Sequence, residues 1–208
     1  MQKSSLWNCP ESDRAMVVDI FNTEKKYDLI LADPPWKQSK GGKKSTRPNS
    51  SGGRLDYPVC DLEEIESHIR RAAENTDGNA VLFLWTIDKY LFAAQEIAER
   101  CGFKLHARMV WNKVTGIPAA FTVRFGHEYL LYMYKGKLRP VAKDQRGKVH
   151  TVFMEKSRRH SEKPEAAFRI IEQLYPKERK IELYARRERA GWDCWGNEVK
   201  PQGEIKHE

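Results

Sequence analysis

The tetrapeptide Asp33-Pro34-Pro35-Trp36 combines a carboxylate, a stiff backbone and a flat aromatic ring. It directly follows the apolar run Tyr27–Ala32, which predicts a short buried strand. Two consecutive prolines can continue neither a sheet ladder nor a helix, so the chain must leave this strand stiffly. Because ligands bind at the carboxyl ends of strands in open α/β sheets, we expect the turn to form part of a binding site.

Transfer of a methyl group to an exocyclic amine of a nucleic acid base would suit these residue types. The amine lone pair is delocalised into the ring, so acceptors for its N–H groups are needed to free it. The Asp33 carboxylate and the Pro34 carbonyl are two such acceptors on a rigid turn. Trp36 can stack on the base, which contributes about 1–3 kcal/mol, once the base has left the duplex. The alternative is a strand-ending turn with a buried tryptophan.

Positive charge is concentrated directly after this turn. The formal net charge of the 208 residues is +8, which favours a polyanionic partner such as nucleic acid. Lys37 to Arg54 carries six basic residues and no acid. We therefore expect residues 37–56 to form a flexible basic loop in which Lys43 and Lys44 contact phosphates. Arg158, in a second basic segment, is assigned the same role, and a merely solvated loop is the alternative.

Several classes of protein are disfavoured by the sequence. No apolar run is long enough to span a bilayer, and the N-terminus lacks the apolar core of a signal peptide. The four cysteines are far apart and the histidines lack the spacing of metal ligands, which argues against a metal site and a disulfide framework. A reducing, intracellular compartment is expected.

Strands alternate with helices along the chain, which predicts an α/β fold whose mostly parallel sheet is flanked by helices. Helices are expected after the caps Asp61 and Asp88 and from Pro164 as first residue, the second with Phe92 on its buried face. Strands are expected over residues 27–32, 81–86, 104–113, 128–134, 149–154 and 180–185. We expect a single domain over residues 1–208.

A methyl donor that contains a nucleoside needs polar groups around its sugar and base. Acidic side chains hold ribose hydroxyls in dinucleotide folds, and Asp19, Asn197 and Glu198 have suitable chemistry. The sequence contains neither a Gly-x-Gly-x-x-Gly motif nor a P-loop, which disfavours a site built around nucleotide phosphates.

Taken together and in order, several segments resemble the MT-A70 family of S-adenosylmethionine-dependent adenine-N6 methyltransferases. The resemblance covers nearly the whole chain from about Val17 to Val199. The matching segments are Asp19-Ile20, Ala32 to Trp36, Leu82 to Trp85, Met109 to Lys113, Gly126 to Glu128, Ser161 to Pro164, Lys180 to Arg186, Gly191 to Asp193 and Trp195 to Glu198.

This resemblance implies a Rossmann-like methyltransferase fold with a permuted motif order, S-adenosyl-L-methionine as cofactor and no metal. It implies that Asp33, Pro34, Pro35 and Trp36 hold the target adenine, with Asp33 also near the amino group of the cofactor. Tyr57 and Glu128 match positions that line the target pocket. The implied cofactor ligands are Asp19 and Ile20 for the adenine, Arg186, Asn197 and Glu198 for the ribose, and Lys163 for the methionine end.

The chain also departs from the family pattern. Residues 37–54 are longer and more basic than the usual first gate loop, and Arg187-Glu188-Arg189 differs from the eukaryotic RNA-modifying members. The zinc-finger module and partner-binding helices of those members are missing, so the chain looks like the bacterial or phage members, which act mainly on DNA in the cytoplasm. The same reaction on RNA, a catalytically silent nucleic-acid-binding subunit and, as a minor option, cytosine-N4 methylation remain alternatives.

Overall fold

The computed structural model describes residues 15–37, 60–115, 117, 122–157 and 162–199. In these ranges seven strands form one sheet in the order β5-β3-β4-β2-β1-β6-β7. Their bounds are β1 Tyr27–Ala32, β2 Thr76–Thr86, β3 Phe103–Asn112, β4 His127–Lys135, β5 Val152–Met154, β6 Lys180–Leu183 and β7 Asp193–Trp195. Only β4 runs antiparallel to its described neighbours, β2 and β3. The predicted mostly parallel α/β sheet is confirmed.

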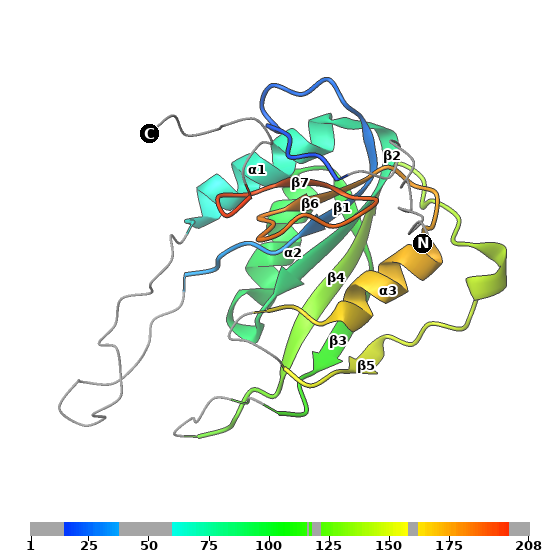
Figure 1. Ribbon diagram of the computed structural model, residues 1–208. Helices are drawn as coiled ribbons and strands as arrows, with labels where there is room; N and C mark the ends of the chain where they lie inside the picture. Colours follow the sequence, from blue (N-terminus) through cyan, green and yellow to red (C-terminus); the bar gives the residue numbers. More distant parts are fainter. Residues whose placement is uncertain (1–14, 38–59, 116, 118–121, 158–161, 200–208) are drawn as a thin grey trace, which may run out of the picture.

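Helices cover both faces of this sheet (Figure 1). They are α1 Leu62–Glu74, α2 Leu91–Arg100 and α3 Glu165–Leu174, with the short 3-10 turns η3 Asp88–Tyr90 and η4 Lys143–Gln145 in the same described ranges. Successive side chains of a strand point to opposite faces. In β1, Ile30 therefore packs in a cluster with residues of α1 and α2, whereas Leu29 and Leu31 pack with residues of α3.

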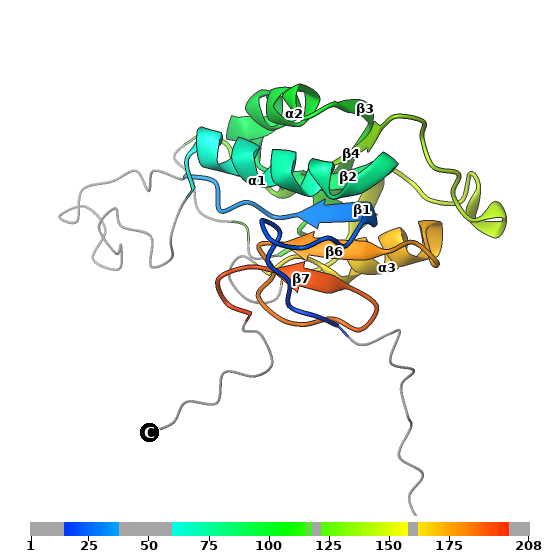
Figure 2. The same ribbon diagram turned by 90° about the horizontal axis from the view of Figure 1, so that it is seen from above.

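The order of the strands brings the ends of several of them to one edge of the sheet. Figure 2 shows β1 between β2 and β6, with β7 beyond β6. Because β1, β2, β6 and β7 are parallel, their carboxyl ends meet at the same edge. The antiparallel strand β4 adds its amino end, at His127 and Glu128, to that edge. This edge is where the sequence predicted the site.

Local signals fixed the first helix better than the second. The Asp61 Oδ1 accepts a hydrogen bond from the Glu64 amide at 2.8 Å, so the predicted cap of α1 is confirmed. The predicted Asp88 cap is wrong, because Asp88 begins η3 and α2 starts only at Leu91, without a side-chain cap. Phe92 is 74% exposed, and Ala94 and Ile97 are buried instead.

The third helix begins one residue later than predicted. Pro164 is the residue before α3, not its first residue, and Phe168 and Ile171 lie on the buried face of α3. In the part of the chain that the structure describes, no helix is long and apolar enough to cross a bilayer.

Candidate functional site

A cavity of about 280 Å³ opens at the carboxyl edge of the parallel strands. Its walls come from the ends of β1, β2, β6 and β7, from the start of β4, and from α1. Most of the residues singled out in the sequence meet here. These are Asp33, Pro34, Pro35, Trp36, Glu128, Lys163, Arg186, Asn197 and Glu198.

The turn after β1 is held by backbone contacts. The Trp36 amide donates to the Pro34 carbonyl at 2.8 Å, and the Cys60 amide donates to the Pro35 carbonyl at 3.3 Å. The Pro34 carbonyl retains a second lone pair for another donor. Asp33 thus follows the buried β1 on a backbone whose direction is fixed on both sides.

Trp36 is buried more deeply than a base-stacking residue needs to be. It is 4% exposed, its Nε1 donates to the Trp85 carbonyl at 2.9 Å, and its ring stacks on Tyr90 with centroids 5.2 Å apart. These contacts bind the turn to β2 and to η3. Trp36 therefore anchors the turn, in addition to the predicted contact with a base.

Two acids and two lysines form a chain of ion pairs along the cavity. Lys163 Nζ lies 2.8 Å from Asp33 Oδ1 and 3.3 Å from Glu128 Oε2, and Lys113 Nζ lies 2.6 Å from Glu128 Oε1. The side chains of Lys163, Asp33 and Glu128 are 15%, 21% and 13% exposed, so little water screens these pairs. The two acids named by the sequence share one ammonium group.

The environment shifts the protonation of these groups in different directions. Burial raises the pKa of Asp33, and the Glu128 carboxylate adds to the rise while Lys163 and Arg186 oppose it. Burial also disfavours ionisation of Glu128, but the adjacent Lys163 and Lys113 outweigh it and lower its pKa. Lys163 is buried, yet Asp33 and Glu128 raise its pKa and keep it protonated.

The opposite wall comes from the C-terminal part of the chain. Arg186 Nε lies 3.5 Å from Glu198 Oε1, and Asn197 lies beside them on the cavity wall. Gly196 packs so closely that a Cβ there would meet the Ala185 carbonyl oxygen at 2.4 Å. Only glycine permits this approach, and it brings Asn197 and Glu198 to the end of β6.

Three aromatic side chains on this wall were missed by the sequence reading. His68 Nδ1 lies 3.0 Å from the Tyr184 hydroxyl, and the His68 and Trp195 ring centroids are 4.7 Å apart. Burial lowers the pKa of His68, against the opposing charge of Glu64, so the imidazole is neutral near pH 7. His68 lies on the helix face that carries Ile65 and Ile69, which also suits a core residue. Tyr184 and Trp195 lie in segments that match the family, but the resemblance gave them no role.

Asp19 and Ile20 do not line the cavity. Asp19 Oδ1 accepts from the Phe21 amide at 3.0 Å. The carbonyl of the buried Ile20 accepts from Asn75 Nδ2 at 2.8 Å. The ring of Phe21, the next residue, lies 5.9 Å from His68 and 6.2 Å from Trp195. The pair therefore lies directly behind the aromatic wall. Tyr57, Lys43, Lys44 and Arg158 lie outside the described residues, as does nearly all of the predicted 37–56 loop.

Glu182 is a second partly buried carboxyl near Asp33. It lies on β6 in register with Leu31, a member of the cluster on the α3 face, and burial and then the Asp33 charge raise its pKa to about 7. A carboxyl whose pKa is raised on folding stabilises the fold below its unfolded pKa, and that contribution is lost as the pH rises through the folded value.

Replacement of this residue therefore has a pH-dependent effect. We expect Glu182→Gln to gain up to about 3 kcal/mol of unfolding free energy over the wild type between about pH 5 and about pH 8, as measured by urea unfolding. The exposed Glu24→Gln is the control and should show no such trend. If the difference in unfolding free energy between the wild type and Glu182→Gln does not change across this pH range, the prediction is wrong.

No set of three or more His, Cys, Asp and Glu side chains in the described ranges is placed to hold a metal ion. The charged, polar and aromatic side chains around the cavity are instead suited to an organic ligand. They comprise an ammonium group, a guanidinium group, an amide, carboxylates and aromatic rings. This combination fits a nucleoside with a charged amino-acid end.

The chain is similar to a known protein family over most of its length. The MT-A70 family model matches residues 27–198. The chain is 32% identical to the Type II methyltransferase M.MunI of a Mycoplasma species, over 88% of this chain and 81% of that protein. It is 26% identical to the N(6)-adenosine-methyltransferase MT-A70-like protein of Arabidopsis thaliana, over 89% of this chain and 25% of the relative.

The chain is also similar to a human protein. The chain is 27% identical to the N(6)-adenosine-methyltransferase catalytic subunit METTL3 of Homo sapiens, over 84% of this chain and 28% of that protein. The chain thus spans only about a quarter of the length of the Arabidopsis and human relatives. The matched region includes β1, the Asp33 turn, Lys163 and the C-terminal wall of the cavity. The chain belongs to the MT-A70 family of methyltransferases.

Proposed function

We propose that this protein transfers a methyl group from S-adenosyl-L-methionine to the N6 amine of adenine in DNA. The observation that carries the proposal is the position of Asp33, on a rigid turn in a cavity that Glu128, Arg186 and Asn197 also line. A carboxylate in this position can serve a base and a cofactor together.

The cofactor half of the cavity fits S-adenosyl-L-methionine by its chemistry. Lys163 offers a cation to the carboxylate of the methionine end, and Arg186, Asn197 and Glu198 offer polar groups to the ribose. We assign the adenine to the side of Phe21, next to Asp19 and Ile20, as the family resemblance implies. When bound, the cofactor supplies an electrophilic methyl group on a sulfonium.

The base half of the cavity would prepare the amine. The Asp33 carboxylate and the Pro34 carbonyl accept hydrogen bonds from the two N–H groups, which draws the nitrogen toward tetrahedral geometry and frees its lone pair. Trp36 is the ring against which we place the base, and its contacts with Tyr90 and Trp85 fix the plane of the ring. After transfer, the amine proton leaves to Asp33 Oδ1 or to water.

Lys163 engages one oxygen of the Asp33 carboxylate, and the other oxygen remains an acceptor for the base. Lys163 Nζ lies 2.8 Å from Asp33 Oδ1, and Glu128 lies on its other side as an alternative partner. A carboxylate on the cofactor would compete for the same ammonium group. We therefore expect cofactor binding to weaken the contact between Lys163 and Asp33 and so to free Asp33 Oδ1 as well.

Two observations favour DNA as the substrate polymer. The chain is 32% identical to the bacterial Type II methyltransferase, compared with 26% and 27% for the plant and human adenosine methyltransferases. It also resembles the minimal bacterial and phage members of the family. The names of the plant and human relatives support adenine N6 as the target and keep RNA as a second candidate.

To test the proposal, the purified protein is incubated with labelled cofactor and with equal amounts of mixed-sequence DNA and RNA. Label in the DNA fraction is the expected result, and label in the RNA fraction would assign the same chemistry to RNA. Binding of both polymers without transfer, and without affinity for the cofactor, would support the silent-subunit alternative and overturn the proposal.

A further inference from the structure

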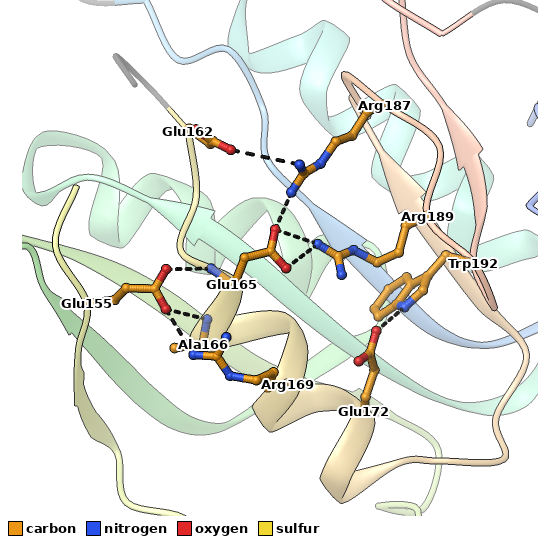
Figure 3. Close-up of polar contacts among 9 residues, drawn as sticks. All are labelled: Glu155, Glu162, Glu165, Ala166, Arg169, Glu172, Arg187, Arg189 and Trp192. Carbon is orange, nitrogen blue, oxygen red and sulfur yellow. Dashed lines mark hydrogen bonds and ion pairs between the residues drawn. The ribbon is translucent and has the colours of Figure 1, made fainter. Parts of the chain in front are cut away.

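Lys163 and Arg186 line the same cavity from segments that are far apart in the sequence. Lys163 lies just before α3, whereas Arg186 lies in the connection between β6 and β7. Neither lies inside a helix or a strand, so the sheet alone does not fix the distance between them. A second set of contacts joins the two segments behind the cavity wall (Figure 3).

The first part of this set fixes the start of α3. Pro164 offers the helix no side-chain cap. The Glu155 carboxylate, from the end of β5, accepts instead from the Glu165 amide at 3.0 Å and from the Ala166 amide at 2.9 Å. A carboxylate at this position satisfies free amides and matches the positive end of the helix dipole. Lys163 is thereby held two residues before a fixed helical turn.

The second part ties α3 to the connection that carries Arg186. The Glu165 carboxylate accepts from Arg189 Nη2 at 2.8 Å and 2.6 Å, and it also accepts from Arg187 Nη2. Figure 3 shows the Glu165 side chain between the two arginines. Arg189 also lies over the Phe168 ring, 3.7 Å from its centroid. The residues on either side of Glu188 are thus directed toward α3.

Charge and burial favour a specific rather than an incidental contact. Glu165 and Arg189 are each mostly buried in this contact. Burial disfavours the charged Glu165, yet the hydrogen bonds and charges of Arg189 and Arg187 outweigh it and lower the Glu165 pKa. The contact therefore keeps its charge across the neutral range. It involves the segment 187–189 in which the chain departs from the eukaryotic members of its family.

We infer that Glu165 is a positioning residue, which sets the separation of Lys163 and Arg186 by holding Arg187 and Arg189 against the start of α3. Glu165 itself does not line the cavity. Its effect on cofactor affinity acts through the two segments that it joins. The inference rests on the proposed use of S-adenosyl-L-methionine, whose two ends these segments would contact.

A matched control lies on the same helix. Glu172 accepts from Trp192 Nε1 at 2.9 Å and so ties α3 to the same connection, but farther from Arg186 in the sequence. A glutamine at position 172 keeps an oxygen acceptor for this neutral donor. A glutamine at position 165 removes the charge that two guanidinium groups require. Glu165→Gln and Glu172→Gln therefore separate the positioning effect from a general loss of contacts on α3.

The experiment measures calorimetric binding of S-adenosyl-L-homocysteine to the full chain as wild type, Glu165→Gln, Arg189→Gln, the double variant and Glu172→Gln. We expect Kd to rise about tenfold in each single variant of the pair, with the double variant no weaker than the weaker single one, because a small displacement of binding groups is costly. Glu172→Gln should stay within about twofold of the wild type. Additive losses, or an unchanged Kd in Glu165→Gln, would overturn the inference.

A second measurement does not depend on the ligand. Amide hydrogen exchange in the ligand-free protein should be faster in peptides that contain Lys163 and Arg186 in Glu165→Gln, and unchanged in Glu172→Gln. Equal exchange in the two variants would contradict the positioning role even if Kd had changed. A wild type that fails to bind S-adenosyl-L-homocysteine would instead count against the proposed function, so the two failures are distinguishable.

Discussion

Asp33→Asn is expected to lower methyl transfer by about 100- to 1,000-fold while leaving S-adenosyl-L-homocysteine affinity within about tenfold of the wild type. The amide keeps the size of the side chain but removes the negative charge, and one of its two terminal atoms becomes a donor. Lys163 keeps Glu128 as a partner at 3.3 Å, so the cavity does not lose its charge network altogether. Asp33→Ala should be at least as inactive.

Single-turnover label transfer at saturating cofactor measures this effect directly. Asp77→Asn is the control, because it also removes an acid that is paired with an arginine, but at an exposed position away from the cavity. The control should retain wild-type transfer. Near-normal transfer by Asp33→Asn would contradict the proposed role of the Asp33 carboxylate in the mechanism.

The same carboxyl sets the pH dependence of the wild type. Burial raises the pKa of Asp33, so the acid form persists to higher pH than for an ordinary aspartate. Transfer should therefore fall on acidification already above the usual pKa range of aspartate, since the protonated group is a poorer acceptor for the amine.

Lys163→Met is expected to have the largest effect on stability. The substitution removes the cation that Asp33 and Glu128 Oε2 share, in a cavity where both carboxylates are mostly buried. Glu128 Oε1 keeps its pair with Lys113. Loss of one partner of a buried pair typically costs about 3–5 kcal/mol. The cost should be greatest near pH 8 and should shrink toward pH 5, because the carboxyls, with raised pKa values in the variant, become neutral by taking up protons.

Urea unfolding at several pH values checks this prediction, with the exposed Lys177→Met as the control. The control should lose less than about 0.5 kcal/mol at every pH. A Lys163→Met variant as stable as this control near pH 8 would show that the two carboxylates are not held by Lys163. Cofactor affinity should fall in the same variant, since Lys163 is the proposed partner of the methionine carboxylate.

The parts of the fold that were predictable are those with local signals. The apolar run Tyr27–Ala32 followed by two prolines indicated a strand and a stiff exit, and β1 has these bounds. Asp61 ahead of an apolar stripe indicated a capped helix, which α1 is. The start of the second helix was misread because Asp88–Tyr90 form the 3-10 turn η3, and a 3-10 turn has no clear sequence signature.

The cavity depends on contacts that no local pattern contains. Asp33 and Lys163 are 130 positions apart in the sequence, and the order of the strands brings them together; composition does not determine that order. The family resemblance supplied Lys163 and Glu128, and the structure brings both to Asp33. It included Trp195 in a matching segment but gave it no role, and it did not supply His68, because aromatic residues near apolar ones are typical of a core. Their role at the cavity became visible only when α1 and β7 were seen side by side.

The most direct test of the central claim is the chemical identity of the methylated nucleoside. The protein is incubated with cofactor that carries an isotopically labelled methyl group and with nucleic acid of mixed sequence, and the digested products are identified by mass spectrometry. The account predicts label in N6-methyladenine with the wild type and its near disappearance with Asp33→Asn. Label in N4-methylcytosine, or no labelled nucleoside from a protein that binds S-adenosyl-L-homocysteine, would contradict it.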